Sequence, residues 1–215
     1  MNVVVFGSTE RVGRLLVAGA LARTHVVTAF GTGRPAPAGP GASAADGRPR
    51  TAPGDLLDPV AVAAAVAGQE AVLYAVEPSG GRERTTRASQ GVRGVVRAMR
   101  DLGVRRLVCL SIGGPGSEPD GDPAGFVGRL LRTSPPKGAL ADLRHMEVTV
   151  RQSGLEWTIV RPAKPIDGEG KHSWRTGPGY AVPHGTKIAR ADVAEFMLDQ
   201  LDDRANVGHA VAIAW

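Results

Sequence analysis

A glycine loop near the amino terminus has the residue types and spacing of a phosphate-binding turn. It consists of Gly7, Ser8, Thr9, Glu10, Arg11, Val12 and Gly13. An apolar run at 2–6 precedes this loop, and apolar residues at helical spacing follow it. In such turns the backbone N–H groups and the dipole of the following helix attract an anion. Gly7 would supply the tight turn, and Gly13 would allow close packing of helix on strand. The loop therefore predicts a site for the pyrophosphate of a dinucleotide.

The loop departs from the dinucleotide fingerprint at Glu10, where a second glycine is expected. A Cβ at this place obstructs the approach of the backbone to the pyrophosphate, and a carboxylate repels the phosphates. Arg11 would offset part of that charge. Two interpretations follow from these residues, a dinucleotide site and a plain strand–helix turn on a scaffold that has lost its cofactor.

The end of the second predicted strand indicates which dinucleotide would bind. A site for NAD usually has an acidic residue there, which binds the ribose hydroxyls. This chain has Phe30, Gly31, Thr32, Gly33 and Arg34 and no acid. We therefore expect NADP(H), with Thr32 and Arg34 contacting the 2′-phosphate. A surface arginine is an equally good interpretation of Arg34 alone, so the absence of an acid is the stronger argument.

The scaffold that positions these residues is predicted from alternating apolar patterns. Short apolar runs predict strands, and apolar residues at helical spacing predict helices between them. The strands are expected at 2–6, 25–30, 71–76, 106–111, 157–160 and 209–213, with a short one near 50–52 and irregular structure at 163–185. This alternation predicts a Rossmann-type, doubly wound α/β fold with a mainly parallel sheet and helices on both faces. We expect one domain over 1–215, with ligands at the carboxyl edge of the sheet.

Composition excludes several classes of function. The formal net charge is +5, but the arginines are dispersed and no basic run carries interleaved aromatic residues, so we expect no nucleic-acid partner. No signal peptide or membrane-spanning run is found, which predicts a cytoplasmic protein. The histidines are scattered without ligand spacing, so we expect no metal. Cys109 is the only cysteine, in an apolar strand with nothing to activate it. The expected partner is a small-molecule substrate, and the expected state is a monomer or homodimer.

The whole chain resembles the atypical short-chain dehydrogenases of the NAD(P)H-binding kind, and among them the flavin reductases of the biliverdin reductase B type. The matching stretches are Gly7 to Gly13, Gly54 to Leu57, Val66 to Val72, Gly103 to Ser111, Arg151 to Pro162 and Ala191 to Met197. Their order and spacing span nearly the whole chain. They are largely scaffold residues, so they define the fold more closely than the activity.

This resemblance implies where the cofactor would lie. The Gly7–Gly13 loop would hold it, with adenine contacts near Asp55 and Leu56 and further contacts from the residues after the fourth strand. Those further contacts are Ala75 and Val76. Ser111 would lie beside the nicotinamide, and Pro162 to Lys164 would cover its other side. Two residues depart from the family pattern, Glu10 in place of a glycine and Thr32 in place of an arginine.

The proton donor of ordinary short-chain dehydrogenases, a tyrosine followed four residues later by lysine, is missing. Hydride transfer to a flavin does not need that pair, because the chemistry belongs to the cofactors. Ser111 is a candidate for binding a substrate carbonyl or the carboxamide, Lys164 for binding an anionic substrate, and His145 for reaching the pocket from a helix. Each also has an ordinary structural interpretation, as a turn serine, a solvated lysine and an exposed helix histidine.

Three functions fit these residues. The first is an NADPH-dependent oxidoreductase that reduces a flavin, quinone or conjugated carbonyl without a Tyr–Lys pair. The second, motivated by Glu10, is a cofactor-independent isomerase, cyclase or dehydratase of a biosynthetic pathway on the same scaffold. The third is a non-enzymatic, NADP-binding redox sensor.

Overall fold

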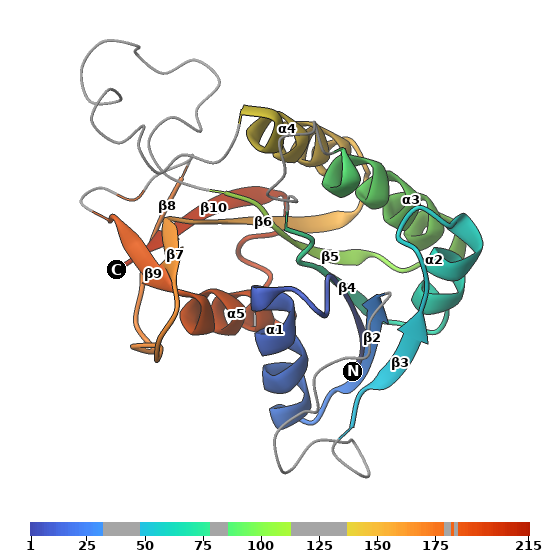
Figure 1. The fold of residues 1–215 in the computed structure, drawn as a ribbon, viewed down its shortest axis with the longest axis horizontal. Coiled ribbons are helices and arrows are strands. Elements are labelled where there is room, and N and C mark those ends of the chain that lie inside the picture. Colours follow the sequence, from blue (N-terminus) through green and yellow to red (C-terminus); the bar gives the residue numbers. More distant parts are fainter. Residues whose placement is uncertain (32–47, 78–85, 113–136, 179–181, 183–184) are drawn as a thin grey trace.

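The computed structural model describes residues 1–31, 48–77, 86–112, 137–178, 182 and 185–215 (Figure 1). Along the chain these residues form β1 (Asn2–Phe6), α1 (Arg11–Ala22), β2 (Val26–Gly31), β3 (Arg50–Pro53), α2 (Pro59–Val66), β4 (Ala71–Tyr74), α3 (Arg87–Leu102), β5 (Arg106–Leu110), α4 (Lys137–Arg151), β6 (Glu156–Pro162), β7 (Lys164–Ile166), β8 (Arg175–Pro178), β9 (Lys187–Ala189), α5 (Arg190–Asp199) and β10 (His209–Ala214).

The strands form one eight-stranded sheet in the order β3-β2-β1-β4-β5-β6-β10-β8. Every neighbouring pair is parallel except β10 and β8, which are antiparallel. Strands β7 and β9 pair with each other in a separate two-stranded sheet. The chain order reverses between β1 and β4, so the carboxyl ends of these two strands border the crevice where open α/β sheets bind ligands.

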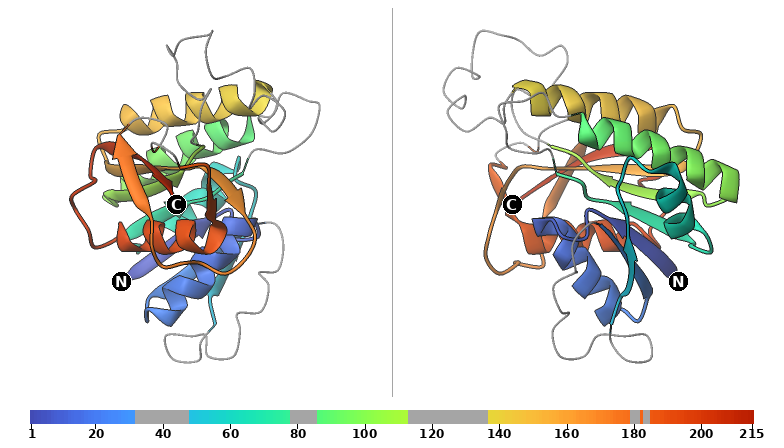
Figure 2. Two further views of the ribbon diagram at one scale, coloured as in Figure 1. Left: turned by 90° about the vertical axis from the view of Figure 1, so that its left-hand side faces the viewer. Right: turned by 45° about the vertical axis from the view of Figure 1, so that its right-hand side comes forward.

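Helices cover both faces of the sheet, as Figures 1 and 2 show. Helices α1 and α5 pack on one face, where Leu16 and Met197 are fully buried. Helices α2, α3 and α4 pack on the other, where Met99 and Met146 are fully buried. The central strands are apolar on both sides, as strands buried between two helical layers must be. The predicted doubly wound α/β fold is therefore confirmed.

One stretch differs from the sequence prediction. The residues at 163–185 were expected to be irregular, but they contain β7 and β8, and β9 follows at Lys187. These strands have three or four residues each, too few for an alternating pattern, and Pro165, Gly177 and Pro178 interrupt them. Short strands of this kind are held by pairing with β10 and with each other rather than by their own composition.

The amino end of α3 depends on a side chain from α4. Thr86, at the start of α3, makes no side-chain hydrogen bond to the first turn. Instead the buried carboxylate of Asp142 accepts the backbone N–H groups of Ala88 and Ser89, each at 3.0 Å. A carboxylate at a helix amino terminus is stabilised by the free N–H groups and by the helix dipole. Asp142 therefore fixes α4 against α3.

Replacing Asp142 by alanine is expected to lower the free energy of unfolding by about 2 kcal/mol, because two buried N–H groups lose a charged acceptor. Urea unfolding followed by circular dichroism measures the loss. Asp101→Ala is the matched control, since Asp101 is exposed and its ion pair among the described residues is a long one, 3.8 Å from Arg97. Equal losses in the two variants would show that the Asp142 contacts do not stabilise the helix pair.

Within the described residues, no helix is long and apolar enough to span a membrane.

Candidate functional site

The loop between β1 and α1 lies at the point where the strand order reverses. Gly7 has φ +82, a conformation that suits glycine, and a Cβ there would lie 2.5 Å from the Ala75 carbonyl oxygen. A Cβ on Gly13 would lie 1.8 Å from the Gly7 carbonyl oxygen, so only glycine fits. The loop thus turns tightly and lies directly against the residues after β4, Ala75 and Val76. This geometry agrees with the roles predicted for the two glycines.

The remaining loop residues are held by ordinary contacts. The buried Ser8 hydroxyl donates to the Phe30 carbonyl at 2.9 Å, which ties the loop to β2. The Glu10 N–H donates to the Gly7 carbonyl at 2.9 Å, and Glu10 has extended backbone angles that any residue adopts. Thr9 and Arg11 are exposed, whereas Val12 is buried. The backbone therefore accepts a side chain at residue 10 without strain.

A second carboxylate approaches the same helix end. Glu77 follows β4, and its Oε1 lies 3.5 Å from the Val12 backbone nitrogen, a long contact at the amino terminus of α1. Burial raises the pKa of Glu10 above its usual value, and the Glu77 carboxylate raises it further, while Arg87 and Arg14 act in the opposite direction. Sequence reasoning missed Glu77, although an acid directly after a buried strand of this fold is a signal. Two acidic side chains thus border the expected pyrophosphate position.

A buried polar network lies beyond the end of β5. The Ser111 hydroxyl contacts Glu147 Oε1 at 2.7 Å, and Arg161 Nε donates to the same oxygen at 2.9 Å. Arg161 Nη2 forms a further short bond to Glu147 Oε2. Ser111 was predicted as a site residue, but Glu147 on α4 and Arg161 on β6 were not. All three side chains are buried, so the network forms part of the wall at the carboxyl edge.

The other predicted residues lie at several places along the chain. Asp55 is exposed, and its carboxylate accepts the Leu57 N–H at 3.1 Å. The Leu56 side chain packs against Gly91 of α3, within the core on that face, so only its backbone remains for an adenine contact. Pro162 is buried at the end of β6, and Lys164 is exposed at the start of β7. Thr32 and Arg34 lie outside the described residues.

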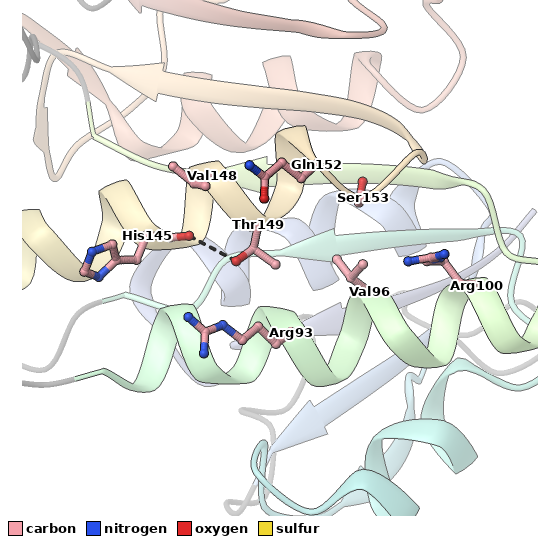
Figure 3. A pocket seen from close by; sticks show the side chains of 8 residues that line it. All are labelled: Arg93, Val96, Arg100, His145, Val148, Thr149, Gln152 and Ser153. Carbon is pink, nitrogen blue, oxygen red and sulfur yellow. Dashed lines mark hydrogen bonds between the residues drawn. The ribbon is translucent and has the colours of Figure 1, made fainter.

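The structure does not bring His145 together with Ser111. His145 is exposed and lines a groove of about 360 Å³ between α3 and α4, together with Arg93 and Arg100 (Figure 3). Figure 3 also shows Val96 of α3 and Thr149 of α4 near the middle of this groove. His145 and Glu147 are two residues apart, about 200° around the helix, so they face different sides. Glu147, not His145, is the α4 side chain that contacts Ser111.

Tyr74 offers no proton donor at the expected pocket. Its side chain is fully buried, and its hydroxyl donates to the Ala88 carbonyl at 2.7 Å. Burial raises the pKa of Tyr74 well above its usual value. Burial likewise raises the pKa of the Cys109 thiol, so this cysteine is not an activated nucleophile.

One cluster among the described residues has metal-ligand chemistry, formed by His172, Asp192 and Glu195. The Asp192 carboxylate is fully buried and already accepts three N–H groups, from the Lys171 and His172 backbones and from the Trp215 indole. The Asp192 oxygens therefore hold the backbone at Lys171 and His172, and the side chain of Trp215, against α5. We interpret this cluster as structural.

The comparisons with known proteins agree with this geometry. A family model described as NAD(P)H-binding matches residues 7–204, which include the glycine loop, the residues after β4 and the network at Ser111. The chain belongs to this NAD(P)H-binding family. A search of curated proteins found no match.

Several solved structures resemble the chain over its whole length. A short-chain dehydrogenase/reductase from Veillonella parvula is 18% identical with a TM-score of 0.80, covering 99% of this chain and 93% of that one. A wide-type short-chain dehydrogenase/reductase from the same organism, solved in complex with NADP, is 17% identical with a TM-score of 0.78, covering 100% and 94%. ChuY, an anaerobillin reductase from Escherichia coli O157:H7, is 21% identical with a TM-score of 0.75, covering 100% and 97%. These likenesses show the fold.

Proposed function

We propose that this NAD(P)H-binding protein is a cytoplasmic NADPH-dependent oxidoreductase that reduces a flavin, quinone or conjugated carbonyl without a Tyr–Lys pair. The glycine turn at the amino terminus of α1, closed against Ala75 at the switch point, is the observation that supports it most. The structural likeness to a reductase and to an NADP complex adds to that support.

In this proposal each part of the carboxyl edge has one task. NADPH, when bound, supplies a hydride to the acceptor. The Gly7–Gly13 loop binds the pyrophosphate through its N–H groups and the α1 dipole. Ser111 lies beside the nicotinamide, Pro162 to Lys164 cover the other side, and Thr32 and Arg34 bind the 2′-phosphate. Lys164, which is exposed, is then free to attract an anionic acceptor.

Calorimetric titration with NADPH and NADH tests the proposal first. Micromolar binding of NADPH with weaker binding of NADH supports it, and NADPH oxidation is then measured with flavin and quinone acceptors. If Arg34 binds the 2′-phosphate, Arg34→Ala weakens NADPH and leaves NADH unchanged. Failure of both dinucleotides to bind would exclude the reductase.

The carboxylates of Glu10 and Glu77 favour a second candidate, a cofactor-independent isomerase, cyclase or dehydratase in the same crevice. A thermal-shift measurement separates the two, because only a cofactor-independent enzyme has a melting temperature that NADP does not change. Binding of NADPH without turnover of any flavin or quinone would instead favour the third candidate, a redox sensor.

The affinity of the wild type for NADPH, relative to that of Glu10→Gln, is expected to rise as the pH falls from about 8 towards 5. Burial and the Glu77 carboxylate already raise the pKa of Glu10, and a bound pyrophosphate adds further negative charge. The complex therefore favours protonated Glu10, and binding takes up a proton. Calorimetry across this range compares the wild type with Glu10→Gln. The 2′-phosphate of the cofactor titrates in both proteins, so the ratio of the two affinities isolates the contribution of Glu10. The affinity of the wild type divided by that of Glu10→Gln should rise as the pH falls, and a constant ratio would contradict the expectation.

A further inference from the structure

The network at Ser111 determines how the serine hydroxyl can interact with a ligand. A hydroxyl has one proton to donate and two lone pairs that accept. Ser111 Oγ lies 2.7 Å from Glu147 Oε1. Glu147 is bound by the guanidinium of Arg161 through both of its oxygens, and a carboxylate in such a pair only accepts hydrogen bonds. The Ser111 hydroxyl therefore donates its proton to the Glu147 carboxylate.

This orientation is fixed from two sides. The Ser111 backbone N–H donates to the Val160 carbonyl at 2.8 Å, which holds the residue at the carboxyl end of β5 beside β6. The side chains of Glu147 and Arg161 are 5% and 3% exposed, so water does not compete for the carboxylate. A hydroxyl bonded to a buried carboxylate keeps its proton there, because turning it away leaves a charged acceptor with one bond fewer.

We propose, resting on the proposed function, that Ser111 is a hydrogen-bond acceptor that recognises an N–H donor of the ligand at the end of β5. Glu147 and Arg161 are positioning residues, because they act on the ligand only through the serine. A serine whose proton is free to donate would bind a carbonyl oxygen. Ser111 instead offers only lone pairs to the ligand, and these repel a carbonyl oxygen. The chemical group that fits is a primary amide or a ring N–H.

Two sources can supply that group at the nicotinamide position. The first is the cofactor, whose carboxamide carries an NH₂ group. The second is the acceptor, since a flavin has a ring N–H whereas menadione, a quinone, has none. Under the proposed function the nicotinamide of the cofactor lies directly beside Ser111 at the end of β5. We therefore expect the carboxamide NH₂ to be the group that donates to Ser111.

The test uses the 3-acetylpyridine analogue of NADP, in which a methyl group replaces the NH₂ of the carboxamide. Calorimetry measures the dissociation constants of NADP and of this analogue, without any turnover. The wild type is expected to bind NADP about tenfold more tightly. Ser111→Ala should weaken NADP to the level of the analogue and leave analogue binding unchanged. Ser153→Ala is the matched control, because Ser153 is a buried serine that donates to the Val150 carbonyl on another part of the chain.

Glu147→Gln tests the positioning role. The glutamine NH₂ group can donate to Ser111, which turns the serine proton towards the ligand. The preference for NADP over the acetyl analogue should then fall at least tenfold, because an acetyl oxygen accepts that proton. A general loss of order in the site would weaken the binding of both ligands alike, so it would not change the preference for NADP over the analogue. If Glu147→Gln does not fold, Ser111→Ala still decides whether Ser111 accepts the ligand N–H.

The outcomes separate this inference from the proposed function. If neither NADP nor NADPH binds the wild type, the proposed function fails. If NADP and the analogue bind the wild type equally, and Ser111→Ala affects flavin and menadione reduction equally, the acceptor role of Ser111 is overturned while the reductase stands. A selective loss of flavin reduction in Ser111→Ala, with unchanged NADP binding, assigns the N–H donor to the acceptor instead of the cofactor.

Discussion

Replacing Glu147 by alanine is expected to lower the free energy of unfolding by about 3–5 kcal/mol. Glu147 and Arg161 form an ion pair in which the two side chains are 5% and 3% exposed. Removing one partner of a buried pair costs more than the pair itself contributes, because the remaining charge stays in a medium of low polarity. The Ser111 hydroxyl would lose its acceptor in the same variant.

Urea unfolding gives the size of this loss, and a second variant shows its origin. Glu147→Leu combined with Arg161→Met removes both charges and keeps comparable volume, so its loss should be clearly smaller than that of Glu147→Ala. Glu156 provides a surface control, because its carboxylate pairs with Arg105 at 3.2 Å and with Arg204 at 2.5 Å, and these arginine side chains are 69% and 59% exposed. Glu156→Ala should therefore cost far less than Glu147→Ala. If the double variant were less stable than Glu147→Ala, the buried charges would not be the cause.

The scaffold follows from the sequence because its signals are local. Residues 3–6 are all apolar, as is typical of a strand covered on both faces, and the structure buries Val3 to Phe6 completely. Gly7 and Gly13 were assigned to a turn and to close packing, and the clashes that a Cβ would meet at each bear this out. Each of these inferences needs only neighbouring residues.

The buried network could not be predicted in the same way, because it joins residues from three distant elements. Ser111, Glu147 and Arg161 come from the end of β5, from α4 and from β6, and a charged residue in a helix usually faces solvent. One local signal did exist. Residues 143, 146 and 150 mark the buried face of α4, and Glu147 lies on that face whereas His145 does not. An acid on the apolar face of a helix indicates a buried partner.

At the amino end of α1, too, the sequence shows one residue of the site but not the distant residue that lies beside it. Glu10 was visible as a departure from the fingerprint, but its effect depends on Glu77, which is far away in the sequence and close in the fold. Parallel strands bring the residues after β1 and β4 to one edge, so an unusual residue after one strand must be weighed with the residues after its neighbour. In this chain Glu77 adds a second carboxylate beside Glu10, so the crevice carries more negative charge than Glu10 alone implies.

Neutralising both carboxylates is therefore expected to tighten NADPH binding about a hundredfold. A unit charge about 6 Å from a phosphate costs about 3 kcal/mol at an effective dielectric constant of about 20, and solvent reduces this to about 1.4 kcal/mol for each carboxylate. Glu10→Gln and Glu77→Gln should each give about tenfold, and the double variant should combine them. Glu10→Gly would add relief from the Cβ to the loss of charge. Calorimetry at low and at high salt measures the constants, and the gain should shrink at high salt.

A control with the same change of net charge separates the local effect from the global one. Glu169→Gln with Asp101→Asn removes two exposed carboxylates on other parts of the chain. This double variant should change the dissociation constant of NADPH less than twofold, because solvent screens charges beyond about 10 Å. Equal gains in both double variants would mean that net charge, not the α1 terminus, sets the affinity. Unchanged binding in Glu10→Gln/Glu77→Gln would mean that the pyrophosphate does not contact the amino end of α1, and the proposed binding mode would then be wrong.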